Sequence, residues 1–179
     1  LVAESMDETN ELVAMLATDD KRQLTEAERA RGVQQMLVLG IDEQRIERAS
    51  RVCARSLEIA EGSPYLYLMR VRFVAEEPVM LIESRVNLEP CPGLENIDFE
   101  REGLFDAVER TSGQQIGTAE MTYSARAAGK KRGRWLQCGE RSPVLDLDQL
   151  VRLEDGTPVE WGSVWMPANR CVISSVRTR

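Results

Sequence analysis

The sequence predicts an α+β fold, in which an antiparallel sheet with short flanking helices follows a small helical segment. From Pro64 onward, runs of apolar and β-branched residues alternate with turn-forming residues, a pattern typical of strands joined by hairpins. Before Pro64 the chain has no proline, and apolar residues recur at spacings of three and four, which favours helices. A length of 179 residues gives room for one sizeable core and a small accessory piece.

The first predicted domain, residues 1–56, is a helical segment. Thr25 and Glu28 form a capping box, so a helix is expected to begin there and to end at Gly40. Asp42 is expected to cap a short helix over 43–49, and a further helix is expected over 52–60. Because a helix, a glycine turn and two short helices follow one another, this segment is a candidate helix-turn-helix.

The second predicted domain, residues 57–179, is a sheet with one internal helix. A turn at Asp155 and Gly156 is expected to close a hairpin. Consecutive strands linked by tight turns favour antiparallel pairing. The strands are expected over 65–74, 79–86, 115–125, 144–153, 159–166 and 171–176, the helix over 104–111, and a basic loop over 130–134.

Composition excludes several classes of function. The chain has no histidine, which removes His-activated nucleophiles and His-ligated zinc. Its four cysteines lie too far apart for a metal knuckle, and no nucleotide-binding loop is present, so no metal or cofactor is expected. The net charge of -7 argues against a surface that grips nucleic acid everywhere, although a local basic face is allowed. Apolar runs are too short for a membrane span, and cytoplasmic localisation is expected.

Five segments in order carry a family resemblance. Residues 57–177 resemble the effector-binding UTRA domain of GntR-type transcription regulators of the HutC subfamily, which has a chorismate-lyase-like fold. The resemblance implies a ligand-responsive transcription regulator that acts as a homodimer, binds a small-molecule effector and catalyses no reaction. The segments are Leu57–Pro64, Leu68–Arg72, Pro78–Ser84, Cys91–Leu94, and Asp155–Glu160 with Asn169 and Arg170.

The resemblance also implies a ligand site. The family's positions fall on Arg70, Arg72, Glu83 with the adjacent Ser84, and Glu160, while Phe105 belongs to the middle helix. Arginine suits a carboxylate or phosphate, and glutamate accepts hydrogen bonds from hydroxyls or an amine. Alternation along a strand puts Arg70 and Arg72 on one side. The plain alternative is a solvated cross-strand ion pair.

Departures from the family pattern bear on the ligand. Phosphosugar-sensing relatives have Ser-Leu-Tyr where this chain has Gly103, Leu104 and Phe105, so two hydroxyl donors are lost and a non-phosphorylated metabolite is favoured. Trp161 and Trp165 are expected on the opposite strand face, in the core.

The predicted regulator is expected to contact DNA either directly or through a missing N-terminal module. A missing module is considered because the chain does not begin with methionine and is expected to be a fragment. Residues 24–42 are similar to the helix-turn-helix entry of ParB-like partition proteins. Arginines at spacings of three and four predict a basic helical face for phosphates, with pairing to nearby glutamates as the alternative. These candidate DNA-binding residues are Arg45, Arg48, Arg51 and Arg55.

Two other functions stay open at this point. One is a chorismate-lyase-like enzyme on the same fold, in which Arg70 or Arg72 holds a substrate carboxylate and Glu83 or Glu160 acts as acid or base. The other is a ParB-like DNA-binding protein.

Overall fold

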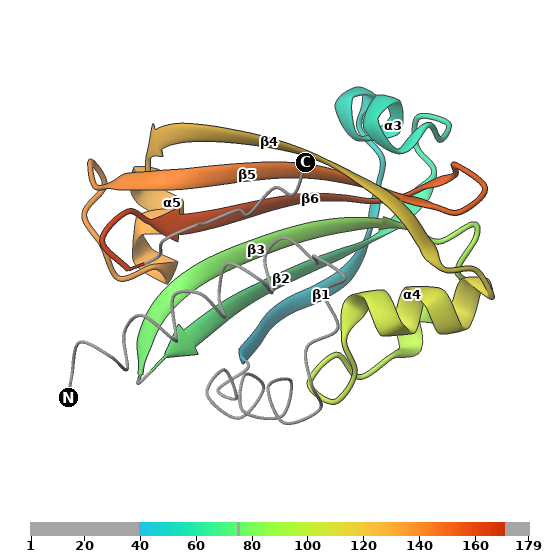
Figure 1. Cartoon of the computed structure of the whole chain (residues 1–179), viewed down its shortest axis with the longest axis horizontal. Coiled ribbons are helices and arrows are strands. Elements are labelled where there is room, and N and C mark those ends of the chain that lie inside the picture. The colour runs from blue at the N-terminus through green and yellow to red at the C-terminus, as the bar shows by residue number, and fades with distance from the viewer. Residues whose placement is uncertain (1–39, 75, 171–179) are drawn as a thin grey trace, which may run out of the picture.

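The computed structural model describes residues 40–74 and 76–170 of the chain, and their strands form a six-stranded antiparallel sheet (Figure 1). The strand order is β1-β2-β3-β6-β5-β4. The strands are β1 (Gly40–Arg48), β2 (Pro64–Val74), β3 (Glu77–Asn87), β4 (Ile116–Ala127), β5 (Pro143–Leu153) and β6 (Pro158–Pro167). The helices are α3 (Arg51–Leu57), the 3-10 turn η1 (Leu94–Asn96), α4 (Leu104–Ser112) and α5 (Gly129–Trp135).

The α+β class and five of the six predicted strands are confirmed. Strands β2 to β6 lie where apolar alternation predicts them, and α4 occupies the predicted helix over 104–111. The hairpin between β5 and β6 turns at Gly156, whose φ of 87° lies in the left-handed region that glycine adopts without a Cβ clash. The strand expected over 171–176 lies outside the described residues.

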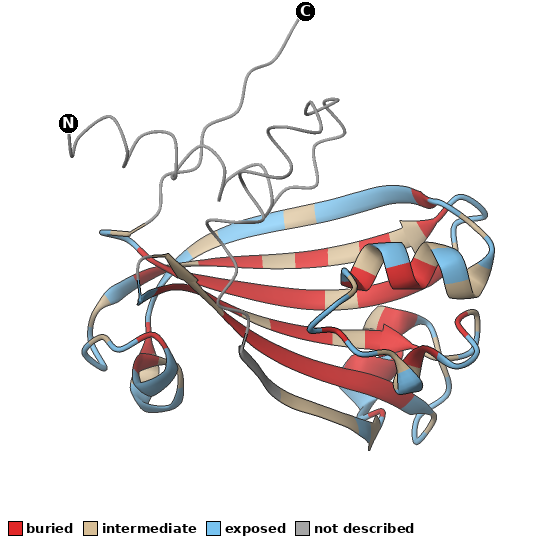
Figure 2. Cartoon of the chain, turned by 90° about the horizontal axis from the view of Figure 1, so that it is seen from below, coloured by how far each residue is buried: buried red, intermediate tan, exposed pale blue. Residues whose placement is uncertain are grey.

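Helices cover both faces of the sheet, which creates two cores. On one face, which we call the α4 face, Leu104 and Val108 of α4 pack against Leu66, Leu68 and Val86 of the sheet. On the opposite face, which we call the α5 face, Leu57 of α3 and Leu136 of α5 pack in a second cluster. The sheet is therefore the middle layer, and its central strands are buried on both sides (Figure 2).

The short helix predicted over 43–49 is wrong, because these residues form most of strand β1. Arg45 pairs with Tyr67 and Glu47 with Tyr65 in an antiparallel ladder with β2. An edge strand with little apolar alternation gives a weak strand signal, and arginines three residues apart imitate a helical face. The sheet partner, which sequence periodicity does not reveal, decides the conformation.

The next helix is present but shorter than predicted. Helix α3 begins after Ser50, whose hydroxyl accepts a hydrogen bond from the Cys53 backbone N–H, and ends at Leu57 rather than at 60. The segment over 130–134, predicted as a loop, belongs to helix α5. Residues 40–48 of the predicted helical segment thus belong to the sheet as β1, and residues 51–56 belong to helix α3. The helix predicted over 25–40 lies almost entirely outside the described residues. No described helix is long and apolar enough to cross a membrane.

We expect the core to be most sensitive at the centre of the sheet. Leu81 is fully buried and pairs with Trp165 across β3 and β6. Leu81→Ala should lower the free energy of unfolding by about 2–5 kcal/mol, because it removes buried methyl groups and leaves a cavity. Val52→Ala, at a side chain that is 64% exposed on α3, should change the free energy by less than about 0.5 kcal/mol. Urea denaturation measures both, and equal losses would contradict this packing.

Candidate functional site

Five polar side chains meet on the α4 face at the middle of the sheet, and we call them the central polar cluster. Strand alternation places them there, because each lies in a row of cross-strand partners whose side chains share that face. Four of the five are buried, and Arg72 is half-buried. The members are Arg70 and Arg72 of β2, Ser84 of β3, Gln149 of β5 and Glu160 of β6.

Glu160 is the most deeply buried member of the cluster. The Gln149 side-chain amide donates a hydrogen bond of 3.0 Å to Glu160 Oε2. Burial raises the pKa of Glu160 from its ordinary value of 4.5 to about 7, although the nearby Ser84 hydroxyl, the Gln149 amide and the charge of Arg70 oppose the rise. The carboxyl group therefore exchanges its proton near neutral pH.

Gly162 makes room for this carboxyl group. A Cβ built on Gly162 would lie 2.2 Å from Glu160 Oε1, so the Glu160 side chain occupies the space that a side chain at 162 would fill. Gly162 stands opposite Ser84 and Gln149 in the strand register, which explains why the carboxyl group meets both of these side chains.

The buried Arg70 and the half-buried Arg72 have no hydrogen-bond or ion-pair partner among the described residues. Arg70 Nε and Arg72 Nη1 are shielded from solvent and have no hydrogen-bond partner, and no ion pair joins either side chain to another described residue. Burial lowers the pKa of each to about 10, and for Arg70 the neighbouring Arg72 charge adds to the effect. Both stay cationic at neutral pH. An unpaired buried charge is costly, so an anion placed here gains strong interactions.

Apolar clusters flank the polar one on both sides. Toward α4 lie Leu66 and Leu68 with the half-buried Phe105 against them, and toward the other end lie Met80, Val164 and Met166 among others. The α4 face therefore combines a charged centre with apolar walls, the composition that small-molecule sites share.

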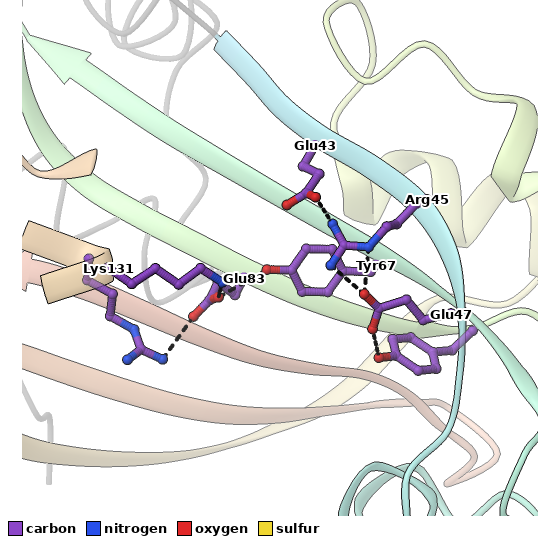
Figure 3. A network of polar contacts seen from close by, with 8 residues as sticks. Glu43, Arg45, Glu47, Tyr67, Glu83 and Lys131 are labelled. Carbon is purple, nitrogen blue, oxygen red and sulfur yellow. Dashed lines mark hydrogen bonds and ion pairs between the residues drawn. The ribbon is translucent and has the colours of Figure 1, made fainter. Parts of the chain in front are cut away.

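Glu83 does not lie with Arg70 and Arg72, which corrects the grouping expected from sequence. Its side chain is on the α5 face, where the Tyr67 hydroxyl donates to Oε1 at 3.0 Å and Arg132 Nη2 donates to Oε2 at 3.1 Å (Figure 3). Lys131 is 3.8 Å from Oε1. Neighbouring strand residues point to opposite faces, so Ser84 joins the central polar cluster and Glu83 cannot.

The α5 face also holds the tryptophans, as predicted. Trp165 is buried in the core cluster of that face and the guanidinium of Arg132 stacks over its ring, 3.6 Å from the centroid. Trp161 packs against the same cluster.

The four candidate DNA-binding arginines do not form the predicted helical face. Arg45 lies on β1, forms ion pairs with Glu43 and Glu47, and stacks on Tyr67 (Figure 3). Arg48 ends the same strand and donates to the Gly62 carbonyl oxygen at 3.2 Å. Arg51 and Arg55 are exposed on α3, so any DNA contact by these two remains a prediction.

Sequence reasoning missed Gln149 as a member of the site and the role of Gly162 as space for Glu160. Gln149 lies in the predicted strand over 144–153, on the face that alternation shares with Leu147 and Val151, and this alternation is the signal that could have found it.

Comparison with known proteins agrees with this fold. The family model of the UTRA domain matches residues 38–171. A solved chain from Escherichia coli CFT073 that is described as a regulator is 42% identical, with a TM-score of 0.70, over 74% of this chain and 96% of that chain. The C-terminal domain of the histidine utilization repressor from Pseudomonas syringae pv. tomato is 19% identical, with a TM-score of 0.73, over 79% of this chain and 98% of that domain.

Among curated proteins, the "Probable fructoselysine utilization operon transcriptional repressor" of Escherichia coli K12 is 22% identical over 134 residues, which are 75% of this chain and 54% of the repressor. The chain thus spans about half the length of the curated relatives it matches.

The fold and these relatives define an effector-binding domain of transcription regulators. The chain belongs to the UTRA domain family of GntR-type regulators. The named relatives are transcription regulators, not enzymes, which confirms the predicted class and leaves the chorismate-lyase-like enzyme without support. The family match also begins at residue 38, so it includes β1 and α3.

The raised pKa of Glu160 predicts a specific pH dependence of stability. The folded protein keeps the Glu160 proton up to pH about 7, whereas the unfolded chain loses it near pH 4.5. The contribution of Glu160 to the free energy of unfolding is therefore fully present below pH 4.5 and is lost as the pH rises to about 7. Glu160→Gln removes this titration, so its stability relative to the unsubstituted protein should rise across that window and level off above it. Urea denaturation of both proteins between pH 4.5 and 8 measures the difference, and two parallel curves would contradict a proton held at Glu160.

Proposed function

We propose that this chain senses a small organic acid through the central polar cluster, as part of a cytoplasmic, homodimeric, DNA-binding transcription regulator. The observation that supports it most strongly is that the guanidinium groups of the buried Arg70 and the half-buried Arg72 lack partners among the described residues. An effector carboxylate would take the place of the missing partner.

A carboxylate fits this site better than a phosphate. The guanidinium fork matches a planar carboxylate with two parallel hydrogen bonds. Gly103 caps α4 without a side-chain hydrogen bond, and the half-buried Phe105 offers no hydroxyl, so this end of α4 lacks the side-chain donors that help to hold a phosphate. The effector class is therefore a non-phosphorylated acid.

Glu160 supplies the second recognition element. Its Oε1 atom is buried and has no hydrogen-bond partner, while its Oε2 atom is held by Gln149. An amine or hydroxyl on the effector would donate to Oε1, and binding of an amine would favour the ionised form of Glu160. The two elements together select an amino acid or hydroxy acid. Two relatives carry names that refer to fructoselysine and histidine, both amino-acid compounds with a carboxylate.

The signal to DNA follows from differential affinity. An effector that binds one arrangement of the dimer more tightly than another shifts the population toward it, and DNA affinity changes with that population. The main DNA contact comes from a part of the whole regulator beyond the described residues. Within the described residues, the exposed Arg51 and Arg55 of α3 are the candidates for an additional contact.

The binding prediction concerns Arg70. In a thermal-shift panel of amino acids, hydroxy acids, sugar acids and their phosphate esters, non-phosphorylated acids should raise the melting temperature most. Arg70→Met should weaken binding of the best compound by about 10- to 100-fold, because a charge-assisted hydrogen bond contributes about 1.5–3 kcal/mol. Isothermal titration calorimetry on both proteins measures the change.

Arg85→Met is the matched control for this experiment. Arg85 is also a half-buried strand arginine, but its side chain is on the α5 face, where it stacks over Trp161. Binding should persist in this variant. Equal loss of binding in both variants, or unchanged binding in Arg70→Met, would contradict recognition by the central polar cluster.

A further inference from the structure

Helix α5 and the turn that follows it are strongly basic, in a chain whose net charge is -7. Residues 129–141 contain five basic residues and one acidic residue. The turn lies beside the start of the helix, because the Gly129 backbone N–H donates to the Glu140 carbonyl oxygen at 2.9 Å. The exposed bases of this segment, which we call the α5 basic patch, are Lys130, Lys131, Arg134 and Arg141.

Interactions within the domain do not account for this charge. Lys131 is 3.8 Å from Glu83 Oε1, but its side chain is 68% exposed, and the other three bases form no ion pair with any described residue. Lys130 and Arg134 are four residues apart on the helix, a spacing at which like charges repel each other. The first turn of α5 holds no acidic residue, although the helix dipole favours acids there. The patch therefore costs the folded domain stability, which points to a partner outside the domain.

Contacts with the sheet hold α5 in one position. Arg132 stacks over Trp165 and bonds Glu83, and Leu136, directly after the helix, is fully buried. Arg170 Nη1 donates to the Leu136 carbonyl oxygen at 2.6 Å. Because the helix is fixed, its exposed charges keep a constant spacing, which lowers the entropic cost of binding an extended polyanion.

An exposed tryptophan ends the helix beside these charges. Trp135 is 38% exposed, whereas Trp161 and Trp165 pack in the core of the α5 face. Its indole N–H is a hydrogen-bond donor, and lysine and arginine are the residues that most often contact phosphates in DNA. Cationic side chains around an exposed donor suit a phosphate backbone.

The patch lies at the end of the sheet where the rest of a regulator would be attached. Gly40 pairs with Val71, and Val71 pairs with Leu81. Leu81 pairs with Trp165, the ring that Arg132 of α5 covers. Three strand spacings, about 14 Å, thus separate Gly40 from Trp165. In the histidine utilization repressor the matched domain is the C-terminal one, so the remainder of that protein precedes it. In the same order, a DNA-binding part would join this domain ahead of Gly40.

Helix α3 lies at the opposite end of the sheet (Figure 1). Strand β1 runs from Gly40 to Arg48 before α3 begins, a length of about 26 Å. The α5 basic patch is therefore closer than Arg51 and Arg55 of α3 to the point of attachment.

We propose that the α5 basic patch binds the phosphate backbone of duplex DNA, next to the stretch that the DNA-binding part of the regulator occupies. The inference rests on the DNA-binding regulator of the proposed function and adds a contact to it. Phosphates carry no sequence information, so this contact adds affinity and orientation for any base sequence. Outside residues 129–141 the chain has an excess of acidic residues, which repel DNA and leave the patch as the side that faces it.

The test is fluorescence anisotropy of a labelled mixed-sequence duplex of about 24 base pairs, titrated with the full chain between about 25 and 200 mM salt. The unsubstituted protein should bind, and the logarithm of its association constant should fall linearly with the logarithm of the salt concentration. The triple variant Lys130→Gln, Arg134→Gln, Arg141→Gln should bind about 10- to 100-fold more weakly at the lowest salt, with a slope reduced by about 3, one for each lost phosphate contact.

A matched control removes the same charge elsewhere. The triple variant Arg51→Gln, Arg55→Gln, Arg101→Gln changes three exposed arginines on α3 and in the loop before α4. It should lose far less affinity and keep most of the salt slope. Thermal unfolding should be the same for both triple variants, because all six side chains are exposed.

Tryptophan emission gives a second, local measurement. Addition of the duplex should change the emission of the unsubstituted protein, and Trp135→Phe should abolish this change, because Trp161 and Trp165 lie in the core. An unaltered change in Trp135→Phe would overturn contact at α5.

Three further results would overturn the inference. Equal weakening in both triple variants would show an effect of net charge alone, and weakening confined to the control would place the contact at α3 or before α4. Poly-glutamate that competes as well as the duplex at equal charge would identify an acidic protein as the partner. Absence of duplex binding by the unsubstituted chain at the lowest salt would remove the contact at α5, whereas the proposed regulator would stand, because its main DNA contact lies beyond the described residues.

Discussion

The structure depends on the burial of positive charge in the middle of a sheet. Arg70 is enclosed between apolar clusters, and Arg72 extends from the same face of β2. In water each guanidinium would be fully hydrated, so its burial costs free energy unless a partner restores the lost interactions. Glu160 supplies part of that compensation through its charge, yet a pKa of about 7 leaves it only partly ionised at neutral pH. The folded domain thus carries more positive than negative charge at this place, and a ligand that brings a negative charge binds more tightly.

The two faces of the sheet treat charge differently, which gives this interpretation its specificity. On the α5 face both oxygen atoms of Glu83 have cationic or hydroxyl partners within the chain, and Arg45 has two glutamates. The bond from Arg132 to Glu83 links α5 to the sheet. Arg85 Nη1 on this face also lacks a hydrogen-bond partner, but the Arg85 guanidinium stacks over Trp161. On the α4 face the guanidiniums of Arg70 and Arg72 have no such partners among the described residues. Strand alternation alone separates the two sets, since Glu83 and Ser84 are neighbours in sequence and lie on opposite faces.

Much of the fold follows from local sequence patterns. Apolar alternation and turn residues such as Gly156 predict the five strands β2 to β6, and the burial of β2, β3, β5 and β6 confirms the pattern. Strand β1 could not be predicted, because an edge strand with charged residues depends on its partner for its conformation. The family resemblance pointed to Arg70, Arg72 and Glu160. The space left by Gly162 and the amide of Gln149 needed the cross-strand register, which joins residues far apart in sequence.

The most direct test of the central claim is a crystal structure of the domain bound to the acid that stabilises it most. The account predicts the ligand carboxylate within hydrogen-bond distance of the guanidinium groups of Arg70 and Arg72, with an amine or hydroxyl of the ligand at Glu160 Oε1. A ligand bound on the α5 face beside Glu83, or one whose carboxylate points to solvent while the two arginines stay unpaired, would contradict it.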